Sequence, residues 1–422
     1  MGGFGVRNEA GDLRPEAGGK PVCGFEVWAG AKYYRLGQAW LCGLLLLSCV
    51  VAAPPSAVAD DRHVTLQLKP HESRPDRITG RVVVEDQQGG LLLEDRFGAY
   101  WTFEATEIEK READSEPFAP SSADEMAESL KAAAGGPSIT VKTKHYVVVS
   151  RASRAYASWC STMLERLRTG FLAHWERQKV PLAPRESLLP ILVLQNKGQF
   201  REFAIRDGAA EVADAYGYYS ARTNRVVLYD LTADQPGPAL GEATQRDEIT
   251  RRLSRSPASV ATVVHEAVHQ LAFNTGLQVR YADNPMWVSE GLAMYFETPD
   301  FSSGSRWTTV GQANPWRLAE FQKSLNSRKA DALATLIQGE NRFRDPASAN
   351  AAYAESWALV HFLATKRRPE WNEYVLRLRD RQPLVFDSAE ERAAGFKKVF
   401  GEDLEALDAK MTEHVRGLRV RR

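Results

Sequence analysis

The sequence predicts an α+β fold in which a small all-β module precedes a larger domain of strands and helices. Three patterns support this prediction. Residues 78–103 contain short strand-like runs separated by turns such as the one around Gly89. Residues 156–175 carry apolar side chains at every third or fourth position, which indicates a helix with one buried face. Residues 258–272 lack Gly and Pro and are broadly apolar, which indicates a deeply packed helix.

The composition is that of an ordinary globular protein whose 422 residues have room for two or three domains. Lys and Arg together number 54, as do Asp and Glu, so the formal net charge is zero. No bulk electrostatic field therefore favours a nucleic acid or another highly charged partner. We expect no nucleic-acid binding.

Residues 1–59 are expected to form a secretory leader. Residues 40–53 are an apolar run that is too short to cross a bilayer comfortably, and residues 57–59 offer an A-x-A cleavage site. Membrane anchoring through an uncleaved leader is one alternative. A lipidated N-terminus is another, since residues 46–49 resemble a lipoprotein box. In each case the protein is expected to be exported to the periplasm, the cell envelope or the exterior.

Cleavage after Ala59 would leave Cys160 as the remaining cysteine. No internal disulfide would then form, although the export route leads to an oxidising compartment. Cys160 falls on the apolar face of the helix expected at 156–175, so its expected role is core packing.

The module predicted at residues 60–111 shows no motif that indicates chemistry. Residues 112–138 are polar and rich in Ala, Ser and Pro, which is typical of a linker, and a short helical piece is expected within them. The module can be a packing element, an adaptor for envelope components, or a propeptide that masks an active site together with the linker. Its strands are expected at residues 78–84, 91–93 and 99–103.

The domain predicted at residues 139–422 begins with strands and ends with helices. Strands are expected at 139–150 and 188–194, and a hairpin at 216–230. Residues 231–255 are expected to form a long polar loop. Further helices are expected at 316–324, 331–338 and 350–366, and in the C-terminal tail.

The segment that organises this domain is the H-E-x-x-H motif at residues 265–269. His265 and His269 are four positions apart and share one face of a helix, so both imidazoles can reach one metal ion. Glu266 is rotated by about 100° around the helix axis, where its carboxylate can face a metal-activated water. The motif therefore indicates two zinc ligands and a general base.

The flanking residues favour a helix here. Ser256 is a good N-cap, Pro257 suits the first helical position, and Gly276 offers a C-terminal stop. Two imidazoles and a carboxylate would be costly to bury in so apolar a helix without partners. A metal ion would supply that partner.

A second helix is expected at residues 287–297, after Pro285. Glu290 in this helix is the candidate for a third metal ligand. Three protein ligands leave one tetrahedral position open, which is typical of a catalytic rather than a structural zinc.

The H-E-x-x-H motif followed by W-x-x-E-G-x-A-x-Y-x-E at residues 287–297 resembles the gluzincins, the thermolysin-like zinc metallopeptidases of the MA clan. The second motif is most similar to that of the aminopeptidase branch, with Ser289 where that branch has Asn. The strong resemblance covers residues 256–297, and a weaker one to uncharacterised bacterial peptidase-MA-like domains extends from 139 to the C-terminus.

The resemblance implies a role for each motif residue. The ligands of one Zn²⁺ ion would be His265, His269 and Glu290. Glu266 would be the catalytic base, and Glu297 would support a histidine ligand through its carboxylate. The aminopeptidase branch also carries a Gly-Ala-Met-Glu-Asn motif that is not found in this sequence, which argues against exopeptidase activity.

The resemblance also implies a thermolysin-like domain in which a mixed, mostly antiparallel sheet packs on the zinc helix and a helical half closes the cleft. The edge strand of the hairpin would line that cleft. A Tyr or His from the helical half would donate a hydrogen bond to the developing oxyanion. Tyr353 is the candidate for this catalytic role, and His361 is the alternative.

The expected function is therefore that of a secreted or envelope-associated zinc peptidase. It would hydrolyse peptides or proteins by a metal-activated water, with Glu266 as general base. Two alternatives stay open. One is a catalytically silent, zinc-stabilised binding or scaffold protein on a peptidase fold. The other is a metal-dependent hydrolase of a different amide or an ester.

Overall fold

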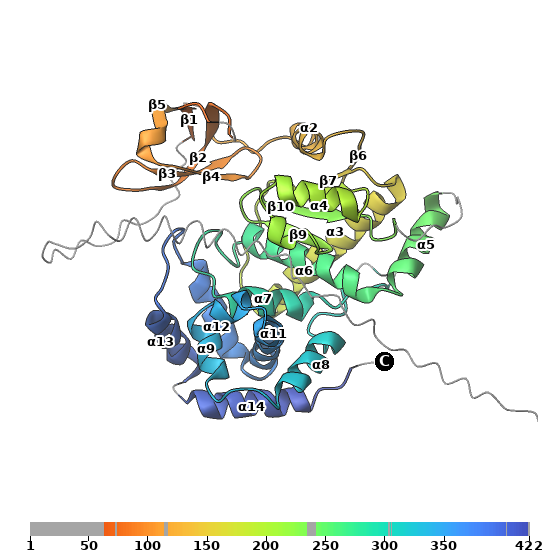
Figure 1. Cartoon of the computed structure of the whole chain (residues 1–422), viewed down its shortest axis with the longest axis vertical. Coiled ribbons are helices and arrows are strands. Elements are labelled where there is room, and N and C mark those ends of the chain that lie inside the picture. Colours follow the sequence, from red (N-terminus) through yellow and green to blue (C-terminus); the bar gives the residue numbers. More distant parts are fainter. Residues whose placement is uncertain are drawn as a thin grey trace, which may run out of the picture.

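The computed structural model shows a mixed α+β protein with a β module, a layered sheet domain and a helical half (Figure 1). The leader predicted at residues 1–59, with its cleavage and lipidation motifs, lies outside the described residues. Within the described part of the chain, no helix has the length and apolar character that a bilayer crossing requires. The described residues are 63–420 except 72–73, 114–116, 234–241, 303, 305 and 402.

The N-terminal module is an antiparallel five-stranded sheet with the order β4-β3-β2-β1-β5. The sequence patterns predicted the second, third and fourth strands along the chain but neither the first nor the last. The last strand, at one edge, is exposed at almost every position, so it shows no apolar alternation that a sequence pattern could detect. The strands are β1 (His63–Leu68), β2 (Arg77–Glu85), β3 (Leu91–Asp95), β4 (Tyr100–Phe103) and β5 (Ile108–Ala113).

Helix α2 (Ala123–Ala134) lies in the stretch at 112–138 that the sequence suggests is a linker. Its first turn is closed by a capping box between Ser122 and Glu125. The buried face of α2 packs on the second sheet. The stretch thus contributes a packed helix to the next layer of the fold.

The second sheet has the order β6-β7-β8-β10-β9. Among these described strands, β6–β7 and β9–β10 pair antiparallel, whereas β7–β8 and β8–β10 pair parallel. The sheet is therefore mixed, as expected, but it has as many parallel as antiparallel pairs, so the prediction of a mostly antiparallel sheet is wrong. Its strands are β6 (Ile139–Lys142), β7 (Tyr146–Ser150), β8 (Leu189–Leu194), β9 (Gly217–Ser220) and β10 (Arg225–Tyr229).

Helices cover both faces of this sheet (Figure 1). Strand β7 contributes side chains to the apolar clusters on both faces of the sheet. Val147 and Val149 belong to one cluster, and Tyr146 and Val148 belong to the other. Side chains of a strand alternate between faces, so a strand buried on both sides appears as a continuous apolar run. One face is covered by α2 and α4 (Lys197–Arg206), and the other by α3 (Arg154–Arg177) and α6 (Pro257–Asn274).

Helix α5 (Glu242–Leu253) corrects the prediction of a loop at 231–255. This helix is polar, and Glu248 pairs with Arg252 one turn later at 2.8 Å. The side chains of Ile249 and Leu253 in this helix are buried. Two apolar positions in a charged segment give too weak a periodicity to predict a helix, and tertiary packing supplies the rest.

The helical half is built around α11 (Ala349–Lys366), whose residues 352–364 are buried on all sides. The helices predicted at 316–324, 331–338 and 350–366 are confirmed within two residues at each end. The other helices are α7 (Met286–Phe296), α8 (Pro315–Ser324), α9 (Ala332–Gln338), α10 (Asn341–Arg344), α12 (Arg368–Arg379), α13 (Ala389–Phe400) and α14 (Leu404–Arg416).

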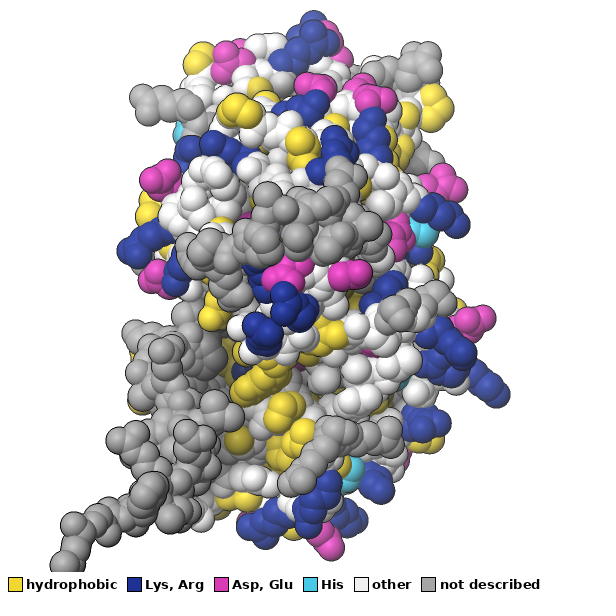
Figure 2. All heavy atoms as spheres, turned by 90° about the vertical axis from the view of Figure 1, so that its right-hand side faces the viewer, with side chains coloured by type: hydrophobic (Ala, Val, Ile, Leu, Met, Phe, Trp, Pro, Cys, Tyr) yellow, Lys and Arg dark blue, Asp and Glu magenta, His cyan; other side chains and the backbone are white. Residues whose placement is uncertain are grey.

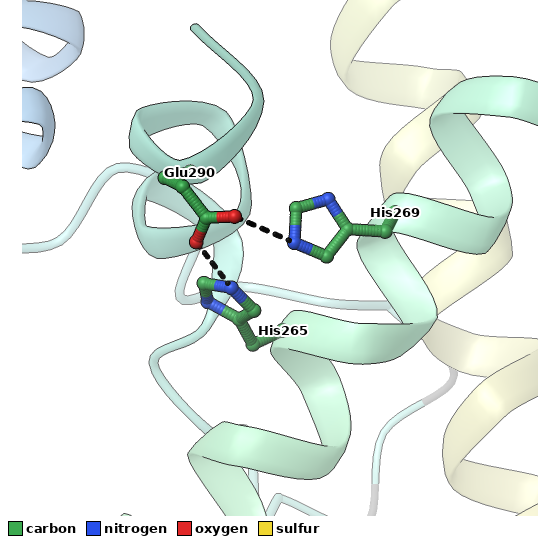
Figure 3. A group of neighbouring side chains, drawn as sticks. All are labelled: His265, His269 and Glu290. Carbon is green, nitrogen blue, oxygen red and sulfur yellow. Dashed lines mark hydrogen bonds and ion pairs between the residues drawn. The ribbon is translucent and has the colours of Figure 1, made fainter. Parts of the chain in front are cut away.

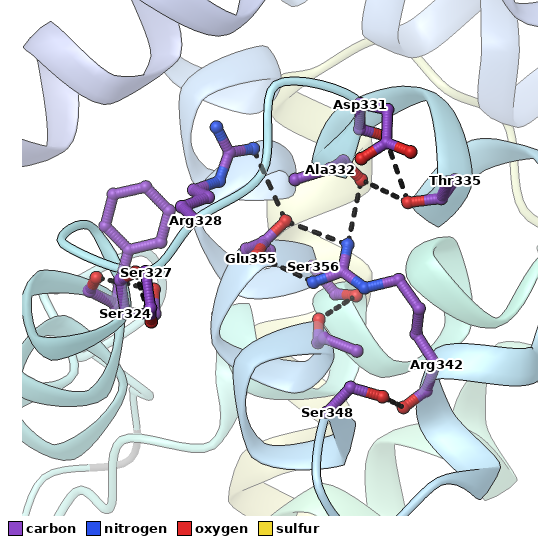
Figure 4. A network of polar contacts seen from close by, with 12 residues as sticks. Ser324, Ser327, Arg328, Asp331, Ala332, Thr335, Arg342, Ser348, Glu355 and Ser356 are labelled. Atoms are coloured by element: carbon purple, nitrogen blue, oxygen red, sulfur yellow. Dashed lines mark hydrogen bonds and ion pairs between the residues drawn. The ribbon is translucent and has the colours of Figure 1, made fainter.

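A buried carboxylate on α11 pairs with arginines from neighbouring segments of the helical half (Figure 4). Glu355 accepts hydrogen bonds from Arg342 at 2.7 Å and from Arg328 at 3.3 Å. Arg342 also donates to the Ala332 carbonyl at 2.8 Å, and Arg328 donates to Asp408 on α14 at 2.7 Å. Because the buried charge of Glu355 is matched by two guanidinium groups, its burial is compensated.

Charged side chains of both signs are interspersed on the upper half of the face shown in Figure 2. Hydrophobic side chains gather in the lower half of the same face. The mixture of signs agrees with the equal counts of acidic and basic residues in the sequence.

Gly291 lets α7 lie against α11, and its replacement by Ala should show how tightly they pack. A Cβ at this position would come within 2.5 Å of both the Ser356 carbonyl oxygen and Val360 Cγ2. We expect Gly291→Ala to lower the free energy of unfolding by about 1–3 kcal/mol, the usual cost of overpacking. Gly395→Ala in α13 is the matched control, since nothing lies within 4 Å of the Cβ that this replacement would add. Thermal denaturation should show the control unchanged or slightly stabilised, and equal midpoints for the two variants would contradict the packing argument.

Candidate metal centre

Helix α6 carries the H-E-x-x-H motif where the sequence predicts a helix, although the Ser256 side chain makes no capping hydrogen bond. It begins at Pro257 after Ser256 and extends to Asn274, slightly beyond the expected range. Gly276 then adopts φ 69°, a left-handed conformation that lets the chain leave the helix without strain. From Ser259 onward nearly every residue of α6 is buried, so the motif lies inside the protein.

Helix α7 brings the third residue of the cluster. It begins at Met286 after Pro285, as predicted, and Glu290 follows one turn later. Gly291 allows the close approach of α7 to α11 described above, and this contact fixes the depth at which Glu290 sits. The ligand candidates therefore come from two helices that are each held by the core.

The side chains of His265, His269 and Glu290 converge (Figure 3). His265 Nε2 lies 3.1 Å from Glu290 Oε2, and His269 Nε2 lies 3.6 Å from Glu290 Oε1. One potential ligand atom from each residue lies within 4.8 Å of the others. All three side chains are buried, with exposed fractions of 1% or less.

The donor atoms suit a divalent metal ion. Bonds of about 2.0–2.1 Å in a tetrahedral arrangement place donor atoms about 3.4 Å apart. Each histidine Nε2 lies near this distance from one of the two Glu290 oxygens, at 3.1 and 3.6 Å. Among the described residues, Glu290 Oε1 has no hydrogen-bond partner, which is unusual for a buried carboxylate oxygen. Burial, together with the proximity of His265, lowers the pKa of His269 well below its ordinary value. His269 is thus neutral, as a metal ligand must be.

Glu297 contacts His265, the residue pair for which the resemblance implies a supporting role. Glu297 Oε2 lies 3.0 Å from His265 Nδ1. If Nδ1 carries the proton, its N–H donates to Glu297, and the lone pair of Nε2 is left for a metal ion. Asn314 and Arg317 donate to Glu297 Oε1 at 2.6 and 2.9 Å. Burial acts to raise the pKa of Glu297, but Arg317 and His265 outweigh it, and the pKa lies below its ordinary value.

Asn314 and Arg317 were not predicted from the sequence. Asn314 caps α8, and its side chain accepts hydrogen bonds from the Trp316 and Arg317 backbone nitrogens. The Asn-Pro pair at the start of α8 is a visible capping signal, but nothing in it points back to Glu297. Only the course of the chain between α7 and α8 brings these residues together.

One carboxylate oxygen of Glu266 is held by the sheet. The Tyr219 backbone N–H donates to Glu266 Oε2 at 2.9 Å. Tyr219 belongs to β9, an edge strand of the sheet, so the predicted edge strand does lie beside the motif helix. A buried carboxylate held by a backbone N–H has a fixed orientation, which a general base requires.

Solvent lies close to this face of α6. Thr262 lies one turn before Glu266, within about 60° of His265 around the helix axis, and is partly exposed. Ala258, a further turn back, is exposed. The face that carries the motif therefore reaches the surface in the first two turns of the helix.

Tyr353 and His361 both lie on α11, and each contacts aromatic rings of neighbouring segments. Tyr353 packs edge-on against Phe343, with ring centroids 5.3 Å apart. His361 Nε2 lies 3.1 Å from the Gly311 carbonyl oxygen, and its Nδ1 lies 3.0 Å from His414 Nε2. Burial, and secondarily His414, lowers the pKa of His361 to about 4. Both ring nitrogens of His361 therefore have contacts, and the role of Tyr353 as an oxyanion donor stays a prediction.

The family described as "Protein of unknown function (DUF1570)" matches residues 259–385 of the chain. The matched stretch contains most of α6, all of α7 and the whole of α11. It therefore covers the three converging side chains and the helix on which α7 packs. No curated protein matches the sequence.

Proposed function

We propose that this protein is an exported zinc-dependent peptidase with a thermolysin-like, gluzincin-type catalytic domain. The observation that carries the proposal is the convergence of His265, His269 and Glu290, with Glu266 on the helix that carries both histidines. Two imidazoles and one carboxylate are the donor set of many hydrolytic zinc sites. A purely structural metal site would have no need of the additional carboxylate at Glu266.

In this proposal, His265, His269 and Glu290 would hold one Zn²⁺ ion. The ion supplies Lewis acidity, which acidifies water and polarises a substrate carbonyl. Glu266 takes a proton from the attacking water and passes it to the leaving amine. The hydrogen bond from the Tyr219 N–H, at 2.9 Å, supports this role because it restricts the orientation of the Glu266 carboxylate.

The substrate of the proposed enzyme is a peptide or protein in an extended conformation. Strand β9 lies at the edge of the sheet beside α6, and an edge strand can pair with an extended chain. The Tyr219 N–H is already engaged by Glu266, so a peptide would use other backbone groups of the strand. Tyr353 is the proposed donor to the oxyanion that develops in the transition state.

A second candidate function is that of a zinc-stabilised binding or scaffold protein without turnover. The complete burial of His265, Glu266 and Glu290 favours it, because a catalytic site must admit substrate and water. The partial exposure of Thr262 favours the peptidase, because it places solvent one helical turn from Glu266.

Metal analysis of the purified protein combined with a peptide-library digest tests the proposal. We expect about one zinc ion per chain, cleavage of peptides, loss of cleavage with a chelator and its recovery with added zinc. Bound metal without cleavage would support the scaffold function or hydrolysis of another amide or an ester. Absence of bound metal, even after dialysis against zinc, would refute the proposed site.

Replacement of Glu297 by Gln tests its support of His265. The amide cannot hold the ring through a charged hydrogen bond, so we expect metal affinity to fall by about 10–100-fold. Competition with a coloured chelator would measure this change. Glu202→Gln, at an exposed position on α4, is the control and should bind metal like the wild type. An unchanged affinity for Glu297→Gln would show that the contact has no influence on the ligand.

A further inference from the structure

The β module is joined to the second domain by a cluster of charges around Glu94 on β3. The Glu94 side chain is 5% exposed and accepts a hydrogen bond from Arg81 of the module at 2.6 Å. It also accepts one from Arg280 of the second domain at 3.1 Å, and it pairs with Arg185 of the same domain. A buried carboxylate that is shared between two domains is costly to separate from its partners.

Arg280 is the centre of this junction. Its side chain is 2% exposed and lies in the loop between α6 and α7. One of its terminal nitrogens donates to the Gly98 carbonyl of the module at 2.7 Å and to the Ala221 carbonyl at 3.2 Å. Its guanidinium carbon lies 3.7 Å from the centroid of the Tyr100 ring, a cation–π contact. One side chain therefore links the module, the α6–α7 loop and the β9–β10 turn.

The β9–β10 turn positions Glu266. Ala221 follows β9 directly, and Tyr219 of that strand donates its N–H to Glu266. The module contacts the same turn through its backbone, since the Tyr100 N–H donates to the Arg222 carbonyl at 2.7 Å. A shift of the turn would therefore move the group that orients the proposed base.

The α6–α7 loop positions Glu290. Gln278, two residues before Arg280, donates to Ser289 Oγ at 2.8 Å, and Ser289 directly precedes Glu290. Both Gln278 and Ser289 are buried. A displacement of Arg280 would therefore move the loop and, through Gln278 and Ser289, the helix that carries Glu290.

We propose that the β module is a permanent part of the catalytic unit and that Arg280 is a positioning residue, through which the module holds Glu266 and Glu290 in place. The catalytic meaning of this inference rests on the proposed function. The claim that Arg280 keeps the β9–β10 turn in place does not depend on the proposed function, because it concerns the structure alone. It assigns residues 63–113 a role different from that of a removable propeptide or a free adaptor.

Arg280→Met in the full-length chain tests the proposal, with Arg81→Met as the matched control. Both variants remove one guanidinium from Glu94, but Arg81 lies within the module and makes no link to the second domain in the contacts described above. We expect amide hydrogen exchange in residues 217–224, which include the Tyr219 N–H, to become at least about 10-fold faster in Arg280→Met. The control should stay within about twofold of the wild type.

Enzyme kinetics and the spectrum of bound Co²⁺ test whether the β9–β10 turn affects the metal centre. In Arg280→Met, kcat for a peptide should fall by about 10–100-fold with little change in KM, because the misplaced groups act on the reacting atoms. The absorption spectrum of bound Co²⁺ should also change. A merely structural role for Arg280 would lower the melting temperature but leave exchange at 217–224, the cobalt spectrum and kcat like those of the control. That result would overturn the proposal.

Proteolytic nicking covers the case in which Arg280→Met fails to fold. A specific protease site inserted between Ala113 and Pro117 would be cut after the full chain has folded. We expect the two fragments to co-elute in size-exclusion chromatography, with exchange at 217–224 unchanged. A module that dissociates while that exchange stays slow would refute the inference. A wild type that binds no Co²⁺ would instead refute the proposed metal site and leave the exchange test valid.

Discussion

Replacing Glu266 with Gln is expected to lower peptide turnover by about 10²–10⁴-fold while the metal stays bound. Gln has nearly the same shape, and its amide oxygen can still accept the Tyr219 N–H that Glu266 accepts at 2.9 Å. The amide cannot take a proton from water, so the variant isolates the loss of the base. Steady-state kinetics on a cleaved peptide and elemental analysis of the same sample would measure both quantities.

Glu202→Gln on α4 is the control for this experiment, because it makes the same chemical change at an exposed position. It should keep wild-type turnover. Full activity in Glu266→Gln would show that another group takes the proton. Loss of metal from this variant would show that Glu266 is itself part of the metal site.

Replacing Glu290 with Gln is expected to weaken metal binding by more than the roughly 10–100-fold expected for Glu297→Gln. The change removes the charged donor of a three-residue site and leaves His265 and His269, which are held separately by α6. A neutral amide oxygen is a poor substitute for a carboxylate, so a stable site requires the intact residue. Zinc or cobalt titration of the two variants would establish the order of their affinities.

The melting temperature gives an independent measure of the same loss. A metal present at 100 times its dissociation constant stabilises the folded state by about 2.7 kcal/mol. Wild-type protein should therefore melt at a higher temperature with zinc than with a chelator, and Glu290→Gln should show a much smaller difference. Equal shifts in the two proteins would place the metal away from Glu290.

The elements with regular apolar spacing could be predicted from the sequence. Helix α6 and helix α7 are found where the H-E-x-x-H motif and the second motif predict them, and His265, His269 and Glu290 converge. These features depend on spacing within a helix and on capping residues such as Pro257, which act over a few positions. The contact between Glu297 and His265 also follows from the motif, although it joins two helices.

Polar elements and long-range contacts could not be predicted in this way. Among the residues whose burial is described, helix α5 and strand β5 have few buried apolar side chains, so their patterns resemble those of loops. The contacts of Tyr219 with Glu266 and of Asn314 with Glu297 join segments 47 and 17 residues apart. No local periodicity encodes such pairs.

The amino-acid pattern determined that a helix would carry two imidazoles and a carboxylate on adjacent faces, because helical geometry is set by neighbouring residues. The packing of the whole chain decided how Glu266 is oriented, how deeply the cluster is buried and how the β module is attached. Those features depend on the Tyr219 N–H, on Gly291 against α11, and on Arg280 among Glu94, Gly98 and Ala221. Each is a contact between segments that only the folded arrangement of sheet and helices brings together.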